Sequence, residues 1–227
     1  MTREPAPDPG GAARGRPPRR PRSDAEANRD RLLAAAASAM TREGRHVPLA
    51  VIAAEAGVGV GTLYRKYADR DALMQALEDR AYGLLSQILG DIARRDLTGL
   101  EAIGDFLART LKIASQLVLP LHGAPPLVTA EAVAARREIN SRLDGFIARG
   151  LADGTIVAPV NATDVIIFSA LITQPLAHGP DWERLAARQT AIFLTGLAGG
   201  GPGNIPGPPV TREDIEAAFG RPPGLTG

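Results

Sequence analysis

The 227-residue chain has no cysteine, and aromatic residues make up only 4% of it. Without cysteine the chain can form neither a disulfide nor a thiolate metal site, which fits a reducing compartment. No apolar run approaches the roughly 20 residues that a membrane-spanning helix needs. The N-terminus also lacks the apolar segment of a secretory signal. We therefore expect a cytoplasmic chain with no membrane partner.

Because aromatic residues are scarce, the core must be built mainly from Ala, Leu, Val and Ile, a mixture that favours packed helices over sheets. Apolar residues recur at helical spacing along most of the chain, and no segment shows convincing strand alternation. The sequence therefore predicts an all-α fold. The expected helices span residues 25–44, 49–56, 60–67, 69–95, 98–114, 129–154, 161–177, 182–198 and 211–220.

Charge and composition divide the chain into four expected parts. Residues 1–22 are rich in Pro, Gly and Arg and are predicted to be a disordered basic arm. Residues 23–70 carry the short helices, residues 71–199 form a larger helical body, and residues 200–227 are a Gly/Pro-rich tail with one short helix. The first 70 residues hold 13 Lys and Arg against 8 Asp and Glu, a net charge of +5, whereas the remainder carries −4. This asymmetry favours a polyanion-binding N-terminal part.

The stretch EAGVGVGTLYRKY, residues 55–67, has three glycines at alternate positions. Such glycines could cradle a nucleotide phosphate, or they could form the corner between two short helices. A dinucleotide site requires GxGxxG directly after a strand, and a P-loop requires GxxxxGK[ST]. This segment reads GxGxG after the helix-prone LAVIAAEA, so neither nucleotide motif is present.

A helix-turn-helix fits the same residues position by position. Ala53 is small where two helices meet, and Gly57 can adopt the positive φ of the turn. The second helix then exposes Thr62, Tyr64 and Lys66, whose side chains suit phosphates and base edges. Any short helical hairpin with a glycine turn would share this geometry.

The segment IAAEAGVGVGTLYRKYADRDAL, preceded by NRDRLLAAAASAM, resembles the DNA-binding domain of the tetracycline-repressor (TetR) family of bacterial regulators. The resemblance covers about residues 24–80, and the all-helical remainder agrees in layout. It implies a homodimer that places two helix-turn-helix units in successive major grooves of a palindromic operator, without a cofactor. The DNA-contacting residues that it implies in this unit are Val60, Gly61, Thr62, Tyr64, Arg65, Lys66, Tyr67 and Arg70.

The arginine-rich arm resembles extensions that some members of this family lay along the minor groove. Its candidate DNA-contacting residues are Arg14, Arg16, Arg19 and Arg20. The sequence departs from the common family pattern at three positions: Pro48 replaces a frequent Thr, Gly59 replaces a frequent Ser cap, and Tyr67 stands where Phe is usual. The first two replacements remove individual DNA contacts but leave the fold possible.

Residues 164–177 and 182–198 are predicted to be two helices that are apolar on several sides, as in a core hairpin or a helix pair shared with a partner. The resemblance favours a homodimer through these helices. The expected interface residues are Ile167, Leu171, Trp182, Gln189 and Phe193. Residues 98–155 are expected to enclose an apolar cavity for a small-molecule effector. Its candidate lining residues are Leu111, Leu117, Leu121, His122, Phe146, Phe168 and Leu171.

Nothing in the sequence predicts an enzyme or a metal site. His46, His122 and His178 are isolated, and no HExxH or GxSxG string occurs. The sequence therefore favours a DNA-binding transcriptional regulator, most simply a repressor released by a mostly apolar effector. The alternatives are an architectural DNA binder without an effector and a small-molecule-binding protein that has lost its DNA function.

Overall fold

The computed structural model describes residues 21–44, 46–122, 129–174, 181–199 and 210–219. Within these ranges all regular structure is helical, which confirms the predicted fold class. The α-helices are α1 (Pro21–Glu43), α2 (Leu49–Glu55), α3 (Val60–Lys66), α4 (Arg70–Ala93), α5 (Gly99–Lys112), α6 (Ala130–Ala152), α7 (Ala162–Ile172), α8 (Trp182–Gly199) and α9 (Arg212–Phe219). Two 3₁₀ turns, η1 (Ala114–Gln116) and η2 (Pro120–His122), follow α5. No helix in the described ranges is long and apolar enough to cross a membrane.

Side-chain caps set several helix ends where the sequence predicts them. The Asp69 carboxylate accepts a hydrogen bond from the Ala72 amide at 2.7 Å and starts α4. Thr98 and Glu101 form a capping box at the start of α5. Helix α7 ends at Ile172, earlier than the predicted residue 177, and residues 175–180 lie outside the described ranges.

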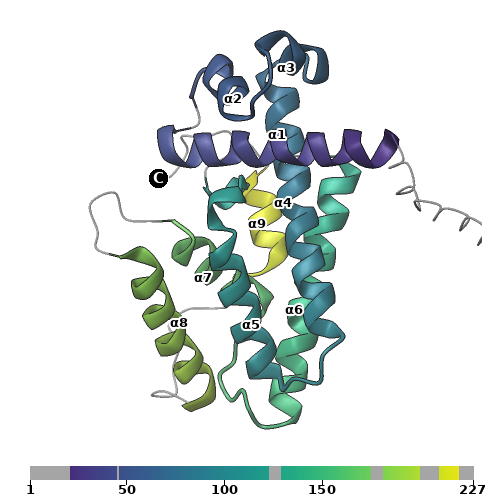
Figure 1. Cartoon of the computed structure of the whole chain (residues 1–227). Helices are drawn as coiled ribbons and strands as arrows, with labels where there is room; N and C mark the ends of the chain where they lie inside the picture. Colours follow the sequence, from purple (N-terminus) through teal and green to yellow (C-terminus); the bar gives the residue numbers. More distant parts are fainter. Residues whose placement is uncertain (1–20, 45, 123–128, 175–180, 200–209, 220–227) are drawn as a thin grey trace, which may run out of the picture.

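The buried side chains form two hydrophobic clusters (Figure 1). The first unites α1, α2, α3 and the start of α4, and we call this part of the molecule the head. The second unites the rest of α4 with α5 to α8, and we call this part, together with α9, the body. In Figure 1, α1 lies across the top of α4, with α2 and α3 above it.

Two segments cross from the head to the body. Helix α4 buries Leu73 and Leu77 in the head cluster and Leu85 and Leu89 in the body cluster. After α5 the chain returns to the head, where Val118 is buried in the head cluster. The two clusters are therefore joined by a rigid helix and by a short return segment.

Helices α5 and α6 approach each other closely at a pair of glycines. A Cβ on Gly99 would overlap the backbone of Gly150 and the carbonyl oxygen of Phe146. The amide of Gly99 also donates a hydrogen bond of 3.1 Å to Asp153, just after α6. Only glycine fits at this crossing without a shift of one helix.

Candidate nucleic-acid interface and ligand cavity

The corner between α2 and α3 is a glycine turn. Gly57 has φ +67°, a left-handed conformation that side chains with a Cβ rarely adopt. The amide of Val58 donates to the carbonyl of Ala53 at 2.9 Å and closes the turn. Gly59 and Gly61 have no positive φ, and a Cβ on either would meet open space. The turn conformation therefore explains Gly57 alone, and the other two keep the start of α3 narrow.

Helix α3 buries Leu63, leaves Thr62 half-buried and exposes its other side chains. Leu63 is fully buried in the head cluster and fixes the rotation of the helix. Val60 and Tyr64 are 44% and 53% exposed, although both are large apolar or aromatic residues. Arg65 and Lys66 are also exposed, and Arg65 donates a hydrogen bond to the Thr62 hydroxyl at 3.0 Å. The exposed face of α3 therefore carries two cations, two hydroxyl groups and no acidic group.

Two of the predicted DNA-contacting residues, Tyr67 and Arg70, are buried or half-buried in the head. Tyr67, at the end of α3, is only 7% exposed and packs in the head cluster, because its position follows Leu63 by one helical turn. Its ring is a core residue and does not face the exposed surface of α3. Arg70 is half-buried and donates a hydrogen bond of 2.6 Å to the carbonyl of Val47, just before α2. Its guanidinium thus holds the start of α2 in place.

The arm is not part of the described structure. Its predicted contact residues Arg14, Arg16, Arg19 and Arg20 all lie outside the described ranges.

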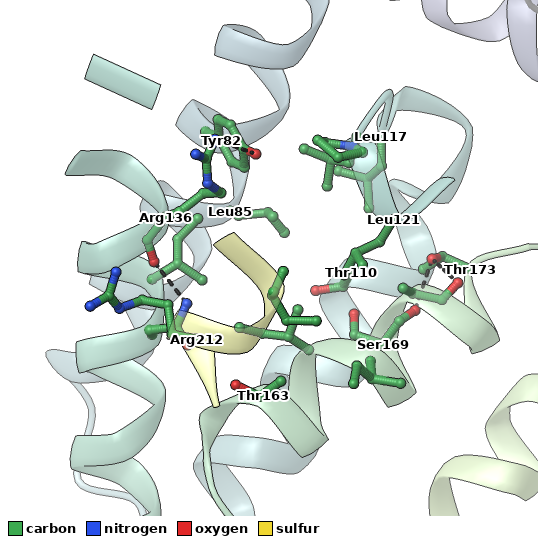
Figure 2. A pocket seen from close by; sticks show the side chains of 18 of the residues that line it. Tyr82, Leu85, Thr110, Leu117, Leu121, Arg136, Thr163, Ser169, Thr173 and Arg212 are labelled. Carbon is green, nitrogen blue, oxygen red and sulfur yellow. Dashed lines mark hydrogen bonds between the residues drawn. The ribbon is translucent and has the colours of Figure 1, made fainter. Parts of the chain in front are cut away.

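The body contains a cavity of about 800 Å³, counting its open mouth (Figure 2). Helices α4, α5, α6, α7 and α9 and the segment after α5 all contribute to its wall. Most of the wall is apolar. The lining residues include Leu85, Phe106, Leu117, Leu119, Leu121, Ile139, Ile166, Ile167 and Ile215. The hydroxyl of Thr110 lies among them but already donates to the carbonyl of Phe106 at 2.8 Å.

The predicted lining residues separate into two groups. Leu117 and Leu121 line the cavity, as expected. Leu111, Phe146 and Phe168 instead pack in or against the body cluster, and Phe168 faces α8, where its ring stacks on Phe193 with centroids 4.1 Å apart. Leu171 is 63% exposed and faces away from the cavity. The side chain of His122 is not described.

One end of the cavity is charged. Arg136 on α6 donates from Nε and Nη2 to the two carboxylate oxygens of Glu216 on α9, at 2.6 and 2.8 Å. Its Nη1 lies 3.8 Å from Glu78 Oε1 and donates to the Tyr82 hydroxyl at 3.4 Å. The hydrogen bond from Arg136 lowers the pKa of Glu216, and burial raises the pKa of Tyr82. These groups form a charge cluster at the junction of α4, α6 and α9.

The sequence predictions missed this charged end, although a signal for it exists. Arg136 lies on the apolar stripe of α6, between Ala132 and Ile139, where a charged residue requires a buried partner. Glu78 is likewise only 1% exposed on the apolar side of α4. Two opposite charges at core positions of neighbouring helices predict a buried pair. No local pattern, however, predicts that α9 reaches them.

The predicted interface residues of α7 and α8 also differ in their surroundings. Ile167 lines the cavity, and Trp182 and Phe193 are half-buried against the body cluster. Leu171 and Gln189 are exposed. Ile192, which the prediction omitted, is 53% exposed on α8. The outer surface of these two helices therefore exposes Leu171, Gln189 and Ile192.

Comparison with known proteins shows that most of the head matches a family model. Residues 32–77 match the sequence model of the bacterial regulatory proteins of the tetR family. No curated protein matches the chain. A TetR transcriptional regulator from Streptomyces coelicolor has 29% sequence identity and a TM-score of 0.57, over 75% of this chain and 98% of that one.

Two further solved structures share the fold at low sequence identity. AibR, in complex with isovaleryl coenzyme A and operator DNA, is 14% identical, with a TM-score of 0.59 over 75% of this chain and 98% of AibR. FadR from Bacillus subtilis, in complex with stearoyl-CoA, is 15% identical, with a TM-score of 0.53 over 74% and 98% of the two chains. At this level of identity the two structures show a shared fold of the described chain.

Proposed function

We propose that this chain acts as a homodimeric repressor of the tetR family, because its head matches the model of that family and its fold resembles that of a solved TetR regulator. Two copies hold a palindromic operator in the cytoplasm, each with α3 in the major groove. A small, mostly apolar effector that enters the body cavity then releases the DNA. The proposal has three parts, namely DNA contact, pairing of two copies and coupling to the cavity.

The observation that carries the proposal is the continuity between the cavity wall and the head core. Leu117 lines the cavity, and the next residue, Val118, is buried in the head cluster. The adjoining turn is tied to the head by a hydrogen bond of 3.2 Å from the Thr41 hydroxyl to the carbonyl of Ser115. A ligand that moves Leu117 must therefore strain the contact of Val118 with the head. This is a physical route for a shift in the position of the head.

Contact with DNA is supported by the exposed face of α3. Lys66 and Arg65 supply positive charge, and the hydroxyls of Tyr64 and Thr62 supply donors for phosphates or base edges. Val60 and Gly61 stand at the N-terminal end of α3, the part of a recognition helix that reads base edges. An exposed Val60 is explained if a thymine methyl group or the groove floor covers it.

Pairing of two copies is supported by the outer surface of α7 and α8. Exposed Leu171 and Ile192 are apolar side chains that a second copy would remove from water. A palindromic operator requires two heads at a fixed separation, which a dimer with two-fold symmetry supplies.

An apolar effector is supported by the cavity wall, most of which is apolar with a few polar groups, as in small-molecule sites. AibR and FadR bind acyl-CoA ligands on the same fold. Because their sequence identity to this chain is low, the similarity supports a shared fold but not a shared ligand. The cavity wall therefore supports an effector with an apolar portion, and the polar groups of the same cavity determine what else the effector carries.

The test is binding to the palindrome in the intergenic region beside the gene, measured by fluorescence anisotropy against a scrambled duplex over a range of salt concentrations. We expect two chains per duplex and a steep fall in affinity with salt. Lys66→Gln should weaken binding by about 1 kcal/mol and reduce the salt slope by about 1. Arg94→Gln, which removes an exposed charge at the far end of α4, is the matched control and should change neither.

Equal affinity for the palindrome and the scrambled duplex would overturn the proposal of a specific regulator. If binding were specific but remained unaffected by every apolar ligand that enters the cavity, the effector part of the proposal would be wrong.

A further inference from the structure

We propose that Arg136 is an anion-binding subsite of the cavity, occupied in this structure by Glu216 of the chain's own helix α9. The effector is then an amphiphile with an apolar chain and a single carboxylate, which takes the place of Glu216 and displaces α9. This inference rests on the proposed function in one respect, that the cavity is the effector site.

The guanidinium of Arg136 binds Glu216 in the geometry that any carboxylate would use. Nε and Nη2 each donate to a separate carboxylate oxygen, at 2.6 and 2.8 Å, and such two-point pairs are the strongest that Arg forms. The side chain of Arg136 is 10% exposed, so water contributes little to its solvation. Figure 2 shows Arg136 beside Tyr82, at one end of the cavity. The subsite is therefore already built for a carboxylate.

Glu78, the buried acid on α4, does not replace Glu216 as the hydrogen-bond acceptor for Arg136. Glu78 approaches Nη1 of Arg136 at 3.8 Å, on the side where Tyr82 also lies. When Glu216 leaves, Nε and Nη2 therefore lose the two bonds to its carboxylate, while Glu78 still lies near Nη1. Buried donors without acceptors are costly. A neutral apolar ligand would leave them so, whereas a carboxylate would restore both bonds.

The remainder of the cavity fits an apolar chain. Leu85, Phe106 and Ile139 line it, and Figure 2 shows Leu85 near Arg136. The hydroxyl of Thr173 lines it as well, but it already donates to the carbonyl of Ser169 at 2.8 Å. The wall thus combines the anion position at Arg136 with an apolar surface. This combination is complementary to a fatty-acid-like molecule, which has a carboxylate at the end of an apolar chain.

Helix α9 occupies this site as a ligand would. Glu216 fills the anion position, and Ile215 beside it contributes to the apolar wall. The helix has only 8 residues, fewer than an isolated helix needs to be stable in water. A second tie to the body is the hydrogen bond of 2.9 Å from Asn161 to the carbonyl of Val210. Helix α9 is stable only when it is docked on the body. A ligand that replaces Glu216 therefore removes the ion pair with Arg136 that holds α9 in place.

The first experiment reports the position of α9. The chain has no cysteine, so Ile215→Cys in the full-length protein gives one thiol at the cavity wall. Its reaction with a thiol reagent is followed with decanoate, or with uncharged methyl decanoate, below the concentration at which either forms micelles. Decanoate should accelerate the reaction by about tenfold, since it competes with α9 for one site, and the ester should not. Ala217→Cys, exposed on α9, is the control and should react rapidly throughout.

The second experiment measures affinity by calorimetry without DNA. Glu216→Gln weakens the internal competitor, so it should bind decanoate about tenfold more tightly than the wild type does. Arg136→Gln should bind decanoate no better than methyl decanoate. Should Arg136→Gln fail to fold, the comparison of Glu216→Gln with the wild type still decides the question.

The outcomes separate the two proposals. Equal binding of decanoate and its methyl ester, or an Ile215→Cys rate that decanoate leaves unchanged, would overturn the carboxylate subsite. Release of DNA by a neutral ligand alone would also overturn it, yet would support the proposed function. Decanoate that displaces α9 but never releases DNA would support the subsite and contradict the effector part of the proposed function.

Discussion

The head and the body of this chain differ in how their functional surfaces are built. The exposed face of the head comes from one helix, α3, whose rotation is fixed by a single buried residue, Leu63. The cavity of the body comes from α4, α5, α6, α7 and α9, and its charged end joins Arg136 to Glu216. The head therefore depends on a local motif, whereas the body depends on packing between distant segments.

This difference has a consequence for stability. The two clusters are buried separately, and the contacts that join them run through α4 and Val118. The body also holds the single tryptophan, Trp182, whose indole nitrogen donates to the carbonyl of Ile172 at 2.9 Å. Tryptophan fluorescence therefore reports on the body, while helical circular dichroism reports on both parts.

The largest effect is expected from Leu63→Ala in the head. The side chain is fully buried, and its truncation should lower the free energy of unfolding of the head by about 3 kcal/mol. In urea the circular dichroism should then show an early transition, before Trp182 fluorescence changes. Val60→Ala, on the exposed side of the same helix, is the control and should leave both signals as in the wild type. A single coincident transition in Leu63→Ala would show that head and body unfold as one unit.

A smaller effect is expected from Gly99→Ala in the body. The added methyl group overlaps the backbone of α6, so the variant should lose about 2 kcal/mol, measured by the urea midpoint of Trp182 fluorescence. Gly145→Ala is the control, because a Cβ there meets open space on α6. That variant should gain about 0.5 to 1 kcal/mol from higher helix propensity. If Gly99→Ala were as stable as Gly145→Ala, α5 and α6 could not lie as close together at Gly99 as the structure places them.

The sequence predicted the head well because its information is local. Gly57 was identified from the turn that it must make, and the exposed residues of α3 follow from helical periodicity once Leu63 is assigned inward. Tyr67 was expected among the DNA contacts only by resemblance to the family, and its side chain is 7% exposed in the head cluster. The same spacing that buries Leu63 also directs Tyr67 into the core.

The cavity could be predicted only in part. Periodicity shows which face of a helix is apolar but not which neighbour that face meets. Phe168 was expected in the cavity, yet it faces α8 and stacks on Phe193. Ile167, which was expected at an interface, lines the cavity. The pairing of Arg136 with Glu216 joins residues far apart in the chain, and only the assembled fold brings them together.

The smallest effect is expected from Tyr67→Phe, which separates a core role from a DNA-contacting role. The Tyr67 hydroxyl is buried and has no hydrogen-bond partner among the described residues. Its removal should therefore raise the free energy of unfolding of the head by about 1 kcal/mol, because an unsatisfied buried hydroxyl is lost. Affinity for the operator should stay the same. Tyr64→Phe is the matched variant, since Tyr64 is 53% exposed on the same helix. It should leave stability unchanged and weaken DNA binding. If Tyr67→Phe weakened operator binding while Tyr64→Phe did not, the assignment of the inner and outer faces of α3 would be reversed.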